Sequence, residues 1–531
     1  MGYEEYLEKV KDMIKDLKAM CAGLGLANTG DEYKIISELF TYKFLNDKLQ
    51  REYQQEKDDY ESYDDFVDFV GDEFARIYED CTIDTMYHLQ SEENFNVLLD
   101  NALIKISDDN DDIYSIETAS GNKKALFEPL SAYIRDEDKE LELAKRSINI
   151  LADPQYHFDK VYDQGWDYFS GIFEFLIKDY NKDSGKYAEY FTPVSAGTIM
   201  AQILYDDTPT EKVTIYDPAA GSGTLLLCMA NAVGVKNCML YSQDISQKSS
   251  QFLRTNLILN KLSSSLHNVI EGNTMTNPYH KDGDDLKTFD FVVSNPPFNM
   301  DFSADVEIMK NDKYNRFFAG VPNVPKSKKE SMAIYQTFLQ HIIASLNEKG
   351  KAAVVVPSGF LTAQTGVGKK IRQRLIDENW LVGAITMPSN IFATTGTNVA
   401  LIFIDKAKTN EDIFLMDAAG LGHKEKIDDN QRTVLSDTET KLIIESFKNK
   451  IEKEDFSIFV KKNDVIKRNY SIYAGQYFPV KVEYAKYTIK EFDELIANHK
   501  KKIGDLSFQG RKLEERISKK LEDLQYEQRK I

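Results

Sequence analysis

A short loop of one asparagine and two prolines holds the residues best suited to chemistry. The loop is Asn295-Pro296-Pro297-Phe298, and the apolar run before it, Phe289 to Val293, has the length and composition of a buried strand. The prolines fix the backbone, so the Asn295 side chain and the neighbouring carbonyls are positioned in advance. Two carbonyl oxygens can accept both hydrogens of one amino group, and the Phe298 ring offers a flat face to a planar group. The loop therefore suits a substrate that reacts through an exocyclic amine.

A second group of candidate residues follows an earlier strand-like run, Val213 to Tyr216. Gly221-Ser222-Gly223 stands between this run and an apolar helical segment, and Asp244 ends the next strand-like run. An acid in that position can bind ribose hydroxyls. Leu226 stands where dinucleotide sites carry a third glycine, which argues against a cofactor with a pyrophosphate. A nucleoside cofactor needs only the tight turn, and S-adenosyl-L-methionine fits this pattern.

The segment Glu189-Tyr190-Phe191-Thr192-Pro193 precedes the first strand. Its aromatic and hydroxyl groups are suited to cover the methionine end of the cofactor. The same residues are also typical of the entry to a helix, with Thr192 as N-cap. Gly368-Lys369-Lys370 lacks both the first glycine and the hydroxyl of a phosphate-binding loop, so ATP hydrolysis is not expected. No metal site is expected.

Composition narrows the class of protein. The length of 531 residues suggests roughly three domains, and the apolar fraction of 42% is enough for a sizeable core. It contains no apolar run of membrane-spanning length, and its charged N-terminus is unlike a signal peptide. The four cysteines have neither metal-site spacing nor the density of a disulfide framework, so we expect a cytoplasmic protein. A net charge of −20 argues against a chain that coats nucleic acid alone, but it allows a local basic groove or a basic partner.

The hydrophobic pattern divides the chain into four parts. Residues 1–165 are helical and acidic in character, which indicates either a solvated surface or a docking face for a basic partner. Residues 166–410 alternate strands and helices and predict a doubly wound, mostly parallel α/β sheet. Residues 411–480 form a mixed C-terminal extension. Residues 481–531 are helical with heptad spacing, typical of a coiled coil with a partner or of a helix packed on its own domain.

A basic stretch lies between Lys310 and Lys329, directly after the asparagine loop. The stretch contains a single acidic residue, Asp312. Its basic residues are Lys310, Lys313, Arg316, Lys326, Lys328 and Lys329. The stretch is interpreted either as a DNA-facing flap or as a merely solvated loop.

Taken together, these motifs resemble the modification subunit of type I restriction-modification systems, which is an N6-adenine DNA methyltransferase. The segments that carry the resemblance, cofactor half first and catalytic half second, are Gly185 to Pro193, Asp217 to Leu226, Asn295 to Phe298, Val354 to Gly359, and Pro388 to Phe392 followed by Thr395-Gly396. The helical N-terminus and the residues from Asp428 to Arg432 also suit this family.

The resemblance implies a Rossmann-like S-adenosylmethionine-dependent methyltransferase fold and methyl transfer to N6 of an adenine flipped out of double-stranded DNA. It implies that Asn295, Pro296, Pro297 and Phe298 hold the adenine. The cofactor contacts it implies are Glu189, Tyr190, Phe191, Thr192, Pro193, Val194, Asp217, Ala220, Gly221, Ser222, Gly223, Thr224, Asp244 and Asn273. Two positions depart from the family pattern. Asp244 replaces the usual glutamate, and Asn273 follows Gly272 where an aspartate often stands.

The resemblance also implies partners. These are a specificity subunit that reads DNA, a restriction and translocase subunit, and two copies of this chain for each specificity subunit. The sequence leaves two alternatives open. A protein-glutamine N5-methyltransferase uses a similar loop, usually with tyrosine where Phe298 stands. A non-catalytic assembly subunit would bind the cofactor without turnover.

Overall fold

The computed structural model describes residues 3–27, 30–70, 74–114, 116–118, 123–134, 136–158, 192–206, 212–392, 398–427, 430–479 and 487–528. The chain divides into two compact units, Met1–Phe478 and Pro479–Ile531. Within the described ranges, no helix is long and apolar enough to cross a membrane.

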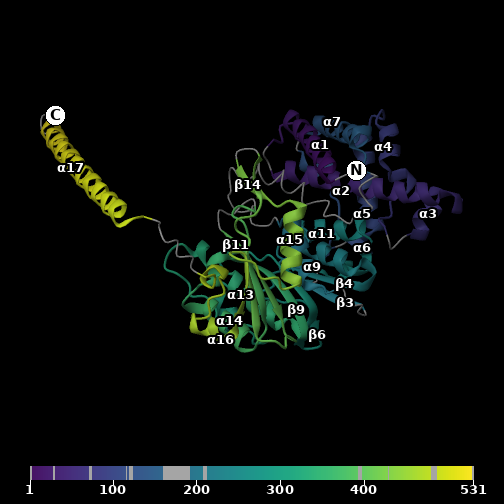
Figure 1. Ribbon diagram of the computed structural model, residues 1–531. Helices are drawn as coiled ribbons and strands as arrows, with labels where there is room; N and C mark the ends of the chain where they lie inside the picture. The colour runs from purple at the N-terminus through teal and green to yellow at the C-terminus, as the bar shows by residue number, and fades with distance from the viewer. Residues whose placement is uncertain are drawn as a thin grey trace. The chain divides into compact units, whose positions relative to one another are not determined.

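A mixed, mostly parallel sheet forms the centre of the first unit (Figure 1). Its strand order is β15-β12-β10-β11-β9-β8-β3-β4-β5, and β1 and β2 extend the β5 edge. The strand bounds are β1 (Ile116–Thr118), β2 (Lys123–Lys124), β3 (Val213–Asp217), β4 (Cys238–Asp244), β5 (Val269–Glu271), β8 (Phe289–Ser294), β9 (Leu346–Pro357), β10 (Leu381–Thr386), β11 (Val399–Asp405), β12 (Asp412–Asp417) and β15 (Ser457–Lys461). The predicted α/β class is confirmed.

The strand order places a crevice between β3 and β8. From β3 the chain winds one way through β4 and β5, and it then returns to β8 and β9 on the other side of β3. These strands run parallel, while β11 is antiparallel to both β9 and β10. Ligands bind beyond the carboxyl ends of parallel strands at such a reversal. Both candidate loops begin there, because one follows β3 and the other follows β8.

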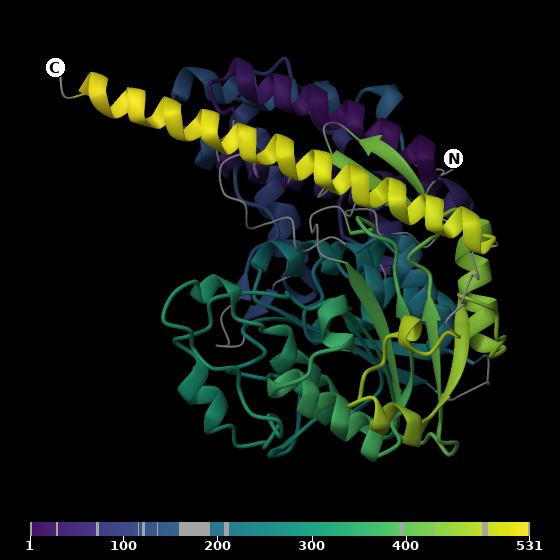
Figure 2. The same ribbon diagram turned by 60° about the vertical axis from the view of Figure 1, so that its left-hand side comes forward.

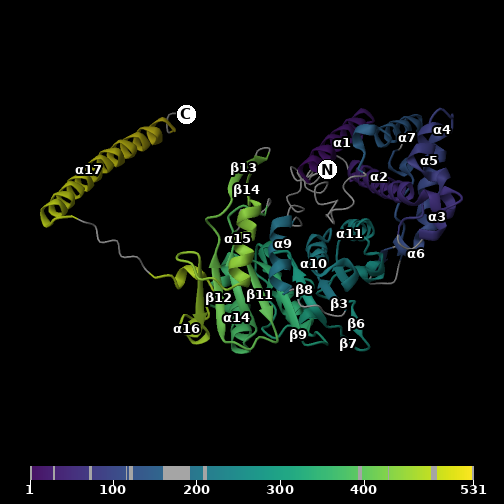
Figure 3. The same ribbon diagram turned by 45° about the vertical axis from the view of Figure 1, so that its right-hand side comes forward.

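Helices cover both faces of the sheet (Figure 3). Their bounds are α9 (Val194–Leu204), α10 (Thr224–Val233), α11 (Gln247–Leu259), α12 (Val306–Lys310), α13 (Tyr335–Ala344), α14 (Gly366–Asp377), α15 (Asp437–Lys448) and α16 (Lys462–Lys467). Helices α9, α10, α11 and α15 lie on one face, and α13 and α14 lie on the other. Right-handed crossovers produce this division, because the direction of winding reverses at β3. The strands are therefore buried on both sides, as the Ala352–Val356 run of β9 shows.

The N-terminal part is helical, as predicted. Its helices are α1 (Tyr3–Gly23), α2 (Gly30–Glu56), α3 (Tyr63–Val70), α4 (Ile83–Leu89), α5 (Phe95–Asp109), α6 (Asp111–Tyr114) and α7 (Glu137–Leu151). Helix α2 packs against α11, and β1 pairs in parallel with β5, so this part is continuous with the sheet. The expected boundary at residue 165 lies outside the described residues.

The sheet continues beyond residue 410, into the range that the sequence pattern assigned to a mixed C-terminal extension. β12 pairs with β10, and β15 then pairs with β12 at the edge. Two small hairpins, β6–β7 (Lys281–Asp282, Asp285–Leu286) and β13–β14 (His423–Ile427, Asn430–Val434), stand outside the main sheet.

The second unit contains one continuous helix, α17 (Ile489–Gln528), drawn in yellow in Figure 2. It runs through Gly504 and Gly510 without a break. Its heptad residues Ile503, Leu513 and Ile517 are more than half exposed. Pairing of this helix with a partner stays a prediction.

Candidate active site

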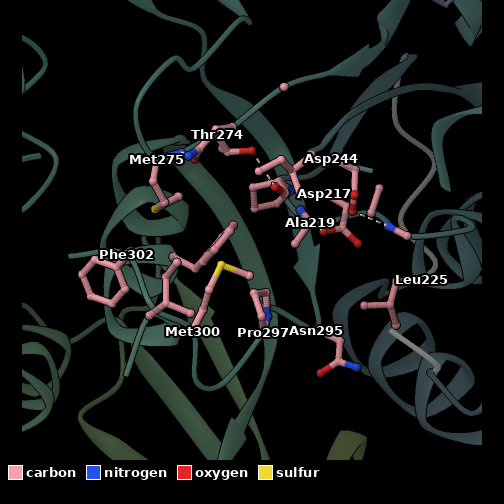
Figure 4. A pocket seen from close by; sticks show the side chains of 18 of the residues that line it. Asp217, Ala219, Leu225, Asp244, Thr274, Met275, Asn295, Pro297, Met300 and Phe302 are labelled. Carbon is pink, nitrogen blue, oxygen red and sulfur yellow. Dashed lines mark hydrogen bonds between the residues drawn. The ribbon is translucent and has the colours of Figure 1, made fainter. Parts of the chain in front are cut away.

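A cavity opens at the carboxyl ends of β3, β4, β5 and β8 (Figure 4). Its empty space is about 860 Å³, including the part open to solvent. In Figure 4, Asp217, Asp244 and Thr274 lie toward one end, Asn295 and Pro297 lie toward the other, and Met300 and Phe302 close a side. The cavity therefore joins the predicted cofactor loop to the predicted catalytic loop.

The glycine loop after β3 depends on backbone conformations that glycine favours. Gly221 has φ of 54° and Gly223 has φ of 92°. The Gly223 N–H donates to the Ala220 carbonyl over 2.9 Å, which closes a tight turn directly before α10. A Cβ at Gly223 would lie 2.2 Å from Cδ1 of Leu253. Close packing of α11 behind the loop thus explains this glycine.

Asp244 fixes the glycine loop from the next strand. Its Oδ2 accepts a hydrogen bond of 2.9 Å from the Gly221 N–H, and its Oδ1 accepts one of 2.8 Å from the Ser246 N–H. Burial raises the pKa of this carboxyl, and the two N–H donors oppose that effect. A carboxylate that accepts two bonds keeps lone pairs for two more donors, as a ribose diol provides.

Asp217 connects the glycine loop after β3 with the end of strand β8. Its Oδ1 accepts hydrogen bonds from the Ala219 N–H, over 3.0 Å, and from Oγ of Ser294, over 2.9 Å. Burial raises the pKa of Asp217 to about 7, and the nearby charge of Asp244 adds to the shift. Because Ser294 directly precedes Asn295, this carboxyl ties the end of β8 to the loop after β3.

Asn295 is half-buried, and its amide is held by Thr192. Nδ2 of Asn295 donates to Oγ1 of Thr192 over 3.1 Å. The amide oxygen is therefore the group that remains to accept bonds from a ligand. The interpretation of Thr192 as a helix N-cap is wrong, because Pro193 occupies that position of α9 and no side chain caps the helix.

Phe298 lies behind the cavity and does not line it. The residue is 9% exposed, and its ring meets the Tyr335 ring edge-on, with centroids 6.4 Å apart. In this conformation the ring offers no free face to a base.

Asn273 lies at the end of β5 and lines the cavity. Its Oδ1 accepts a hydrogen bond of 3.0 Å from the Met275 N–H, and its Nδ2 donates to Oδ2 of Asp305 over 3.3 Å. Thr274 donates from Oγ1 to the Pro218 carbonyl over 2.8 Å, which joins this loop to the one after β3.

The residues present fit a nucleoside cofactor. The glycine turn permits close approach, Asp244 has acceptor capacity for a diol, and the wall beyond β5 is apolar and lined by Met275, Phe302 and Met309. Within the described ranges, no group of acidic, histidine and cysteine side chains is arranged to hold a metal ion.

Comparison with known proteins identifies the family. Residues 164–485, more than half of the chain, match the N-6 DNA methylase family. The chain belongs to the N-6 DNA methylase family. It is similar to the type I restriction enzyme MpnII methylase subunit of Mycoplasma pneumoniae, with 25% identity over 498 residues that cover 88% of each chain. It is also similar to the EcoKI methylase subunit of Escherichia coli, with 28% identity over 46% of each chain.

Solved structures support the same fold for this N-6 DNA methylase. The type I restriction-modification methyltransferase subunit from Streptococcus thermophilus superposes with a TM-score of 0.68 at 20% identity, covering 90% of this chain and all of that one. A modification subunit of a type I enzyme from Vibrio vulnificus gives a TM-score of 0.55 at 14% identity, covering 86% and 93%. The family and fold predicted from the motifs are confirmed.

Most of the predicted site residues in this N-6 DNA methylase gather around the cavity. The predicted residues that line it are Thr192, Asp217, Ala220, Gly221, Ser222, Thr224, Asp244, Asn273, Asn295 and Pro297. Those described but not lining it are Pro193, Val194, Gly223, Pro296 and Phe298. Glu189, Tyr190 and Phe191 lie outside the described residues.

Sequence reasoning missed an apolar part of the lining. These residues are Ile245, Met275, Met300, Phe302, Met309, Ile334 and Phe338, together with the acidic Asp305. Several come from the irregular segment after Phe298, which has no periodicity to reveal it. Among these residues, only Ile245 could have been predicted from the sequence, because it directly follows the predicted site residue Asp244.

The basic stretch is not uniformly directed at solvent. Arg316 is 2% exposed and pairs with Asp312 over 2.8 Å. Its guanidinium also donates to the carbonyls of Thr274 and Met275, over 2.9 and 2.7 Å. The expectation that Arg316 belongs to a DNA-facing or solvated surface is therefore wrong. Lys326, Lys328 and Lys329 are exposed.

Proposed function

We propose that this chain transfers a methyl group from S-adenosylmethionine to N6 of an adenine in double-stranded DNA, as the modification subunit of a type I restriction-modification system. The observation that carries the proposal is a single cavity bordered by Asp244 and the glycine loop on one side and by Asn295 on the other. Family membership favours DNA adenine over the protein-glutamine alternative.

The cofactor would bind against the loops after β3, β4 and β5. Asp244 would accept bonds from the ribose hydroxyls, and the Gly221 turn would let the cofactor lie close to the backbone. When bound, S-adenosylmethionine supplies an electrophilic methyl group on sulfonium. Glu189, Tyr190 and Phe191 are proposed to cover its methionine end.

Asn295 would hold the reacting amine. Its Oδ1 would accept one N6 hydrogen, and the Pro296 carbonyl, which does not line the cavity in this structure, would accept the other once the loop closes on the base. Both bonds would raise the electron density on nitrogen. The N6 lone pair would take this methyl group, the thioether would leave with the electron pair of the C–S bond, and N6 would release one proton to water. Catalysis would be mostly positioning, and no general base is required.

The adenine must leave the DNA stack to reach the cavity, at a cost of a few kcal/mol. Phe298 would stack on the extruded base. Because its ring is packed against Tyr335, stacking would require the ring to turn toward the cavity when DNA binds.

Replacing Asn295 tests the reaction directly. Asn295→Ala should bind cofactor normally but lose methyl transfer from tritiated S-adenosylmethionine to DNA by at least about 100-fold. The exposed neighbour Asn299 provides the matched control, and Asn299→Ala should retain activity. Undiminished methylation by Asn295→Ala would reject this assignment of the site. Absence of methylation by the unaltered chain in its complete complex would favour a non-catalytic assembly role.

The partners are part of the proposal. A specificity subunit would supply sequence readout, two copies of this chain would flank it, and a restriction and translocase subunit would join them. The chain alone should therefore methylate DNA weakly, and adding its specificity subunit should restore methylation at one bipartite sequence. Efficient sequence-specific methylation by the isolated chain would contradict this dependence.

A further inference from the structure

One carboxylate in the cavity wall has no role in the proposed reaction. Asp305 follows the catalytic loop and lies among the residues that line the cavity. It occupies the N-cap position of α12, but its side chain makes no capping hydrogen bond. Oδ2 instead accepts the bond from Nδ2 of Asn273, over 3.3 Å.

The Asn273 amide is oriented by its other contact. Its Oδ1 accepts from the Met275 N–H over 3.0 Å, so its NH₂ group faces Asp305. Asn273 thus offers a ligand no charged acceptor. Among the described residues, Oδ1 of Asp305 has no hydrogen-bond partner, and the side chain is only partly buried. The pair therefore presents one carboxylate oxygen that is held in place and available.

The position of this Asp305 oxygen relative to Asp244 decides which part of a bound nucleoside it could contact. Asp244 ends β4, Asn273 follows β5, and neighbouring strands are about 4.8 Å apart. A nucleoside whose ribose lies on Asp244 would place its base at the end of β5, against Met275, Phe302 and Met309. An adenine amino group in such an apolar pocket needs an acceptor.

We propose that the Asp305 carboxylate accepts a hydrogen bond from the amino group of the cofactor's adenine, and that Asn273 positions this carboxylate. The assignment rests on the proposed use of S-adenosylmethionine. It makes Asp305 a specificity residue for the cofactor, because a carboxylate accepts from an amine and cannot donate.

A double-mutant cycle between protein and ligand tests the contact. Binding of S-adenosylhomocysteine, and of the analogue with hydrogen in place of the adenine amino group, would be measured by calorimetry on the unaltered full chain and on Asp305→Ala. Removing the amino group should weaken binding to the unaltered chain about tenfold or more, but less than threefold in the variant. In Asp305→Asn, removing the amino group should weaken binding by a factor between those of the unaltered chain and Asp305→Ala. Glu307→Gln is the matched control, since Glu307 is an exposed acid paired with Lys310, and it should match the unaltered chain.

The outcomes separate the two levels of the proposal. If removal of the amino group weakens binding equally in the unaltered chain and in Asp305→Ala, the proposed Asp305 contact is wrong. The same holds if Asp305→Asn and Asp305→Ala weaken both ligands alike, because Asp305 would then only support the shape of the pocket. If the unaltered chain binds neither ligand, the proposed cofactor is wrong, and the contact falls with it.

Discussion

Oγ1 of Thr192 accepts a hydrogen bond of 3.1 Å from Nδ2 of Asn295. The two residues are 103 positions apart in the chain, and the bond joins the entry of α9 to the end of β8. Since the amide nitrogen is engaged, the amide oxygen is the group left to accept a hydrogen bond from a ligand. The orientation of the Asn295 amide thus depends on a residue outside its own loop.

Loss of this hydroxyl should reduce catalysis more than binding. We expect Thr192→Val to lower the single-turnover methylation rate of the complete complex by about 10- to 100-fold, since a small misplacement of a reacting group has that effect. Thr192→Ser keeps an acceptor oxygen and should remain within a few-fold of normal. Equal rates for the two variants would show that the hydroxyl does not orient Asn295.

Gly223 should be intolerant of any side chain. Gly223→Ala requires a left-handed backbone, which costs about 1–2 kcal/mol, and brings Cβ against Leu253. We expect a lower free energy of unfolding in urea and weaker cofactor binding. Gly359→Ala serves as control, because no atom lies within 4 Å of its Cβ position and its φ is not left-handed. Similar stabilities for both variants would contradict the role of the turn.

Stability should depend on pH through Asp217. Burial raises its pKa to about 7 from about 3.9 in the unfolded chain, so between these values the folded state binds more protons than the unfolded state. The free energy of unfolding should therefore fall as pH rises through this window, by at most about 1.4 kcal/mol per pH unit from this group.

Asp217→Asn removes that titration while keeping an acceptor oxygen for the Ala219 and Ser294 donors. Urea unfolding between pH 5 and 7.5 should give a flatter stability curve for this variant. An unchanged slope would mean that Asp217 is ionised throughout the range.

Two ion pairs lie around α12, the buried Arg316–Asp312 pair and the exposed Lys310–Glu307 pair. They should differ strongly in their contribution to the free energy of unfolding. All five N–H groups of Arg316 face acceptors, which are the Asp312 carboxylate, the carbonyls of Thr274 and Met275, and Nδ1 of His341. Burial and the charge of Arg316 lower the pKa of His341 well below its usual value. Arg316→Met should cost about 3–5 kcal/mol, because Asp312 is left as a buried unpaired charge.

Lys310→Met removes the partner of the exposed Glu307 and should cost less than about 1 kcal/mol. Chemical denaturation of both variants provides the comparison. Equal losses would show that burial does not distinguish the two pairs.

The exposed lysines of the basic stretch offer a test of its role. If Lys326, Lys328 and Lys329 contact phosphates, changing all three to glutamine should reduce the dependence of log Kd on log salt by up to about 3 for DNA binding by the complex. The control changes three exposed lysines elsewhere, Lys349, Lys441 and Lys453. An equal slope for both triple variants would identify the stretch as a solvated loop.

Local patterns in the sequence were sufficient to predict the fold class and the two loops of the candidate site. Strand-length apolar runs, alternating with helical periods, predicted the parallel sheet, because each element must bury its own face. Gly221-Ser222-Gly223 and Asn295-Pro296-Pro297 were recognisable because each motif constrains its own backbone. Since both loops follow strands, their convergence at one edge of the sheet was also predictable.

Packing between distant segments decided the rest. A sequence does not distinguish a buried cation from an exposed one, so only the surrounding acceptors place Arg316 in the interior. The inward position of Phe298 depends on Tyr335, and the availability of Asp305 depends on Asn273. These contacts form only when loops after different strands meet, and no local propensity encodes which side chains then face one another. The tertiary structure therefore determined which polar groups of the site are engaged and which remain available to a ligand.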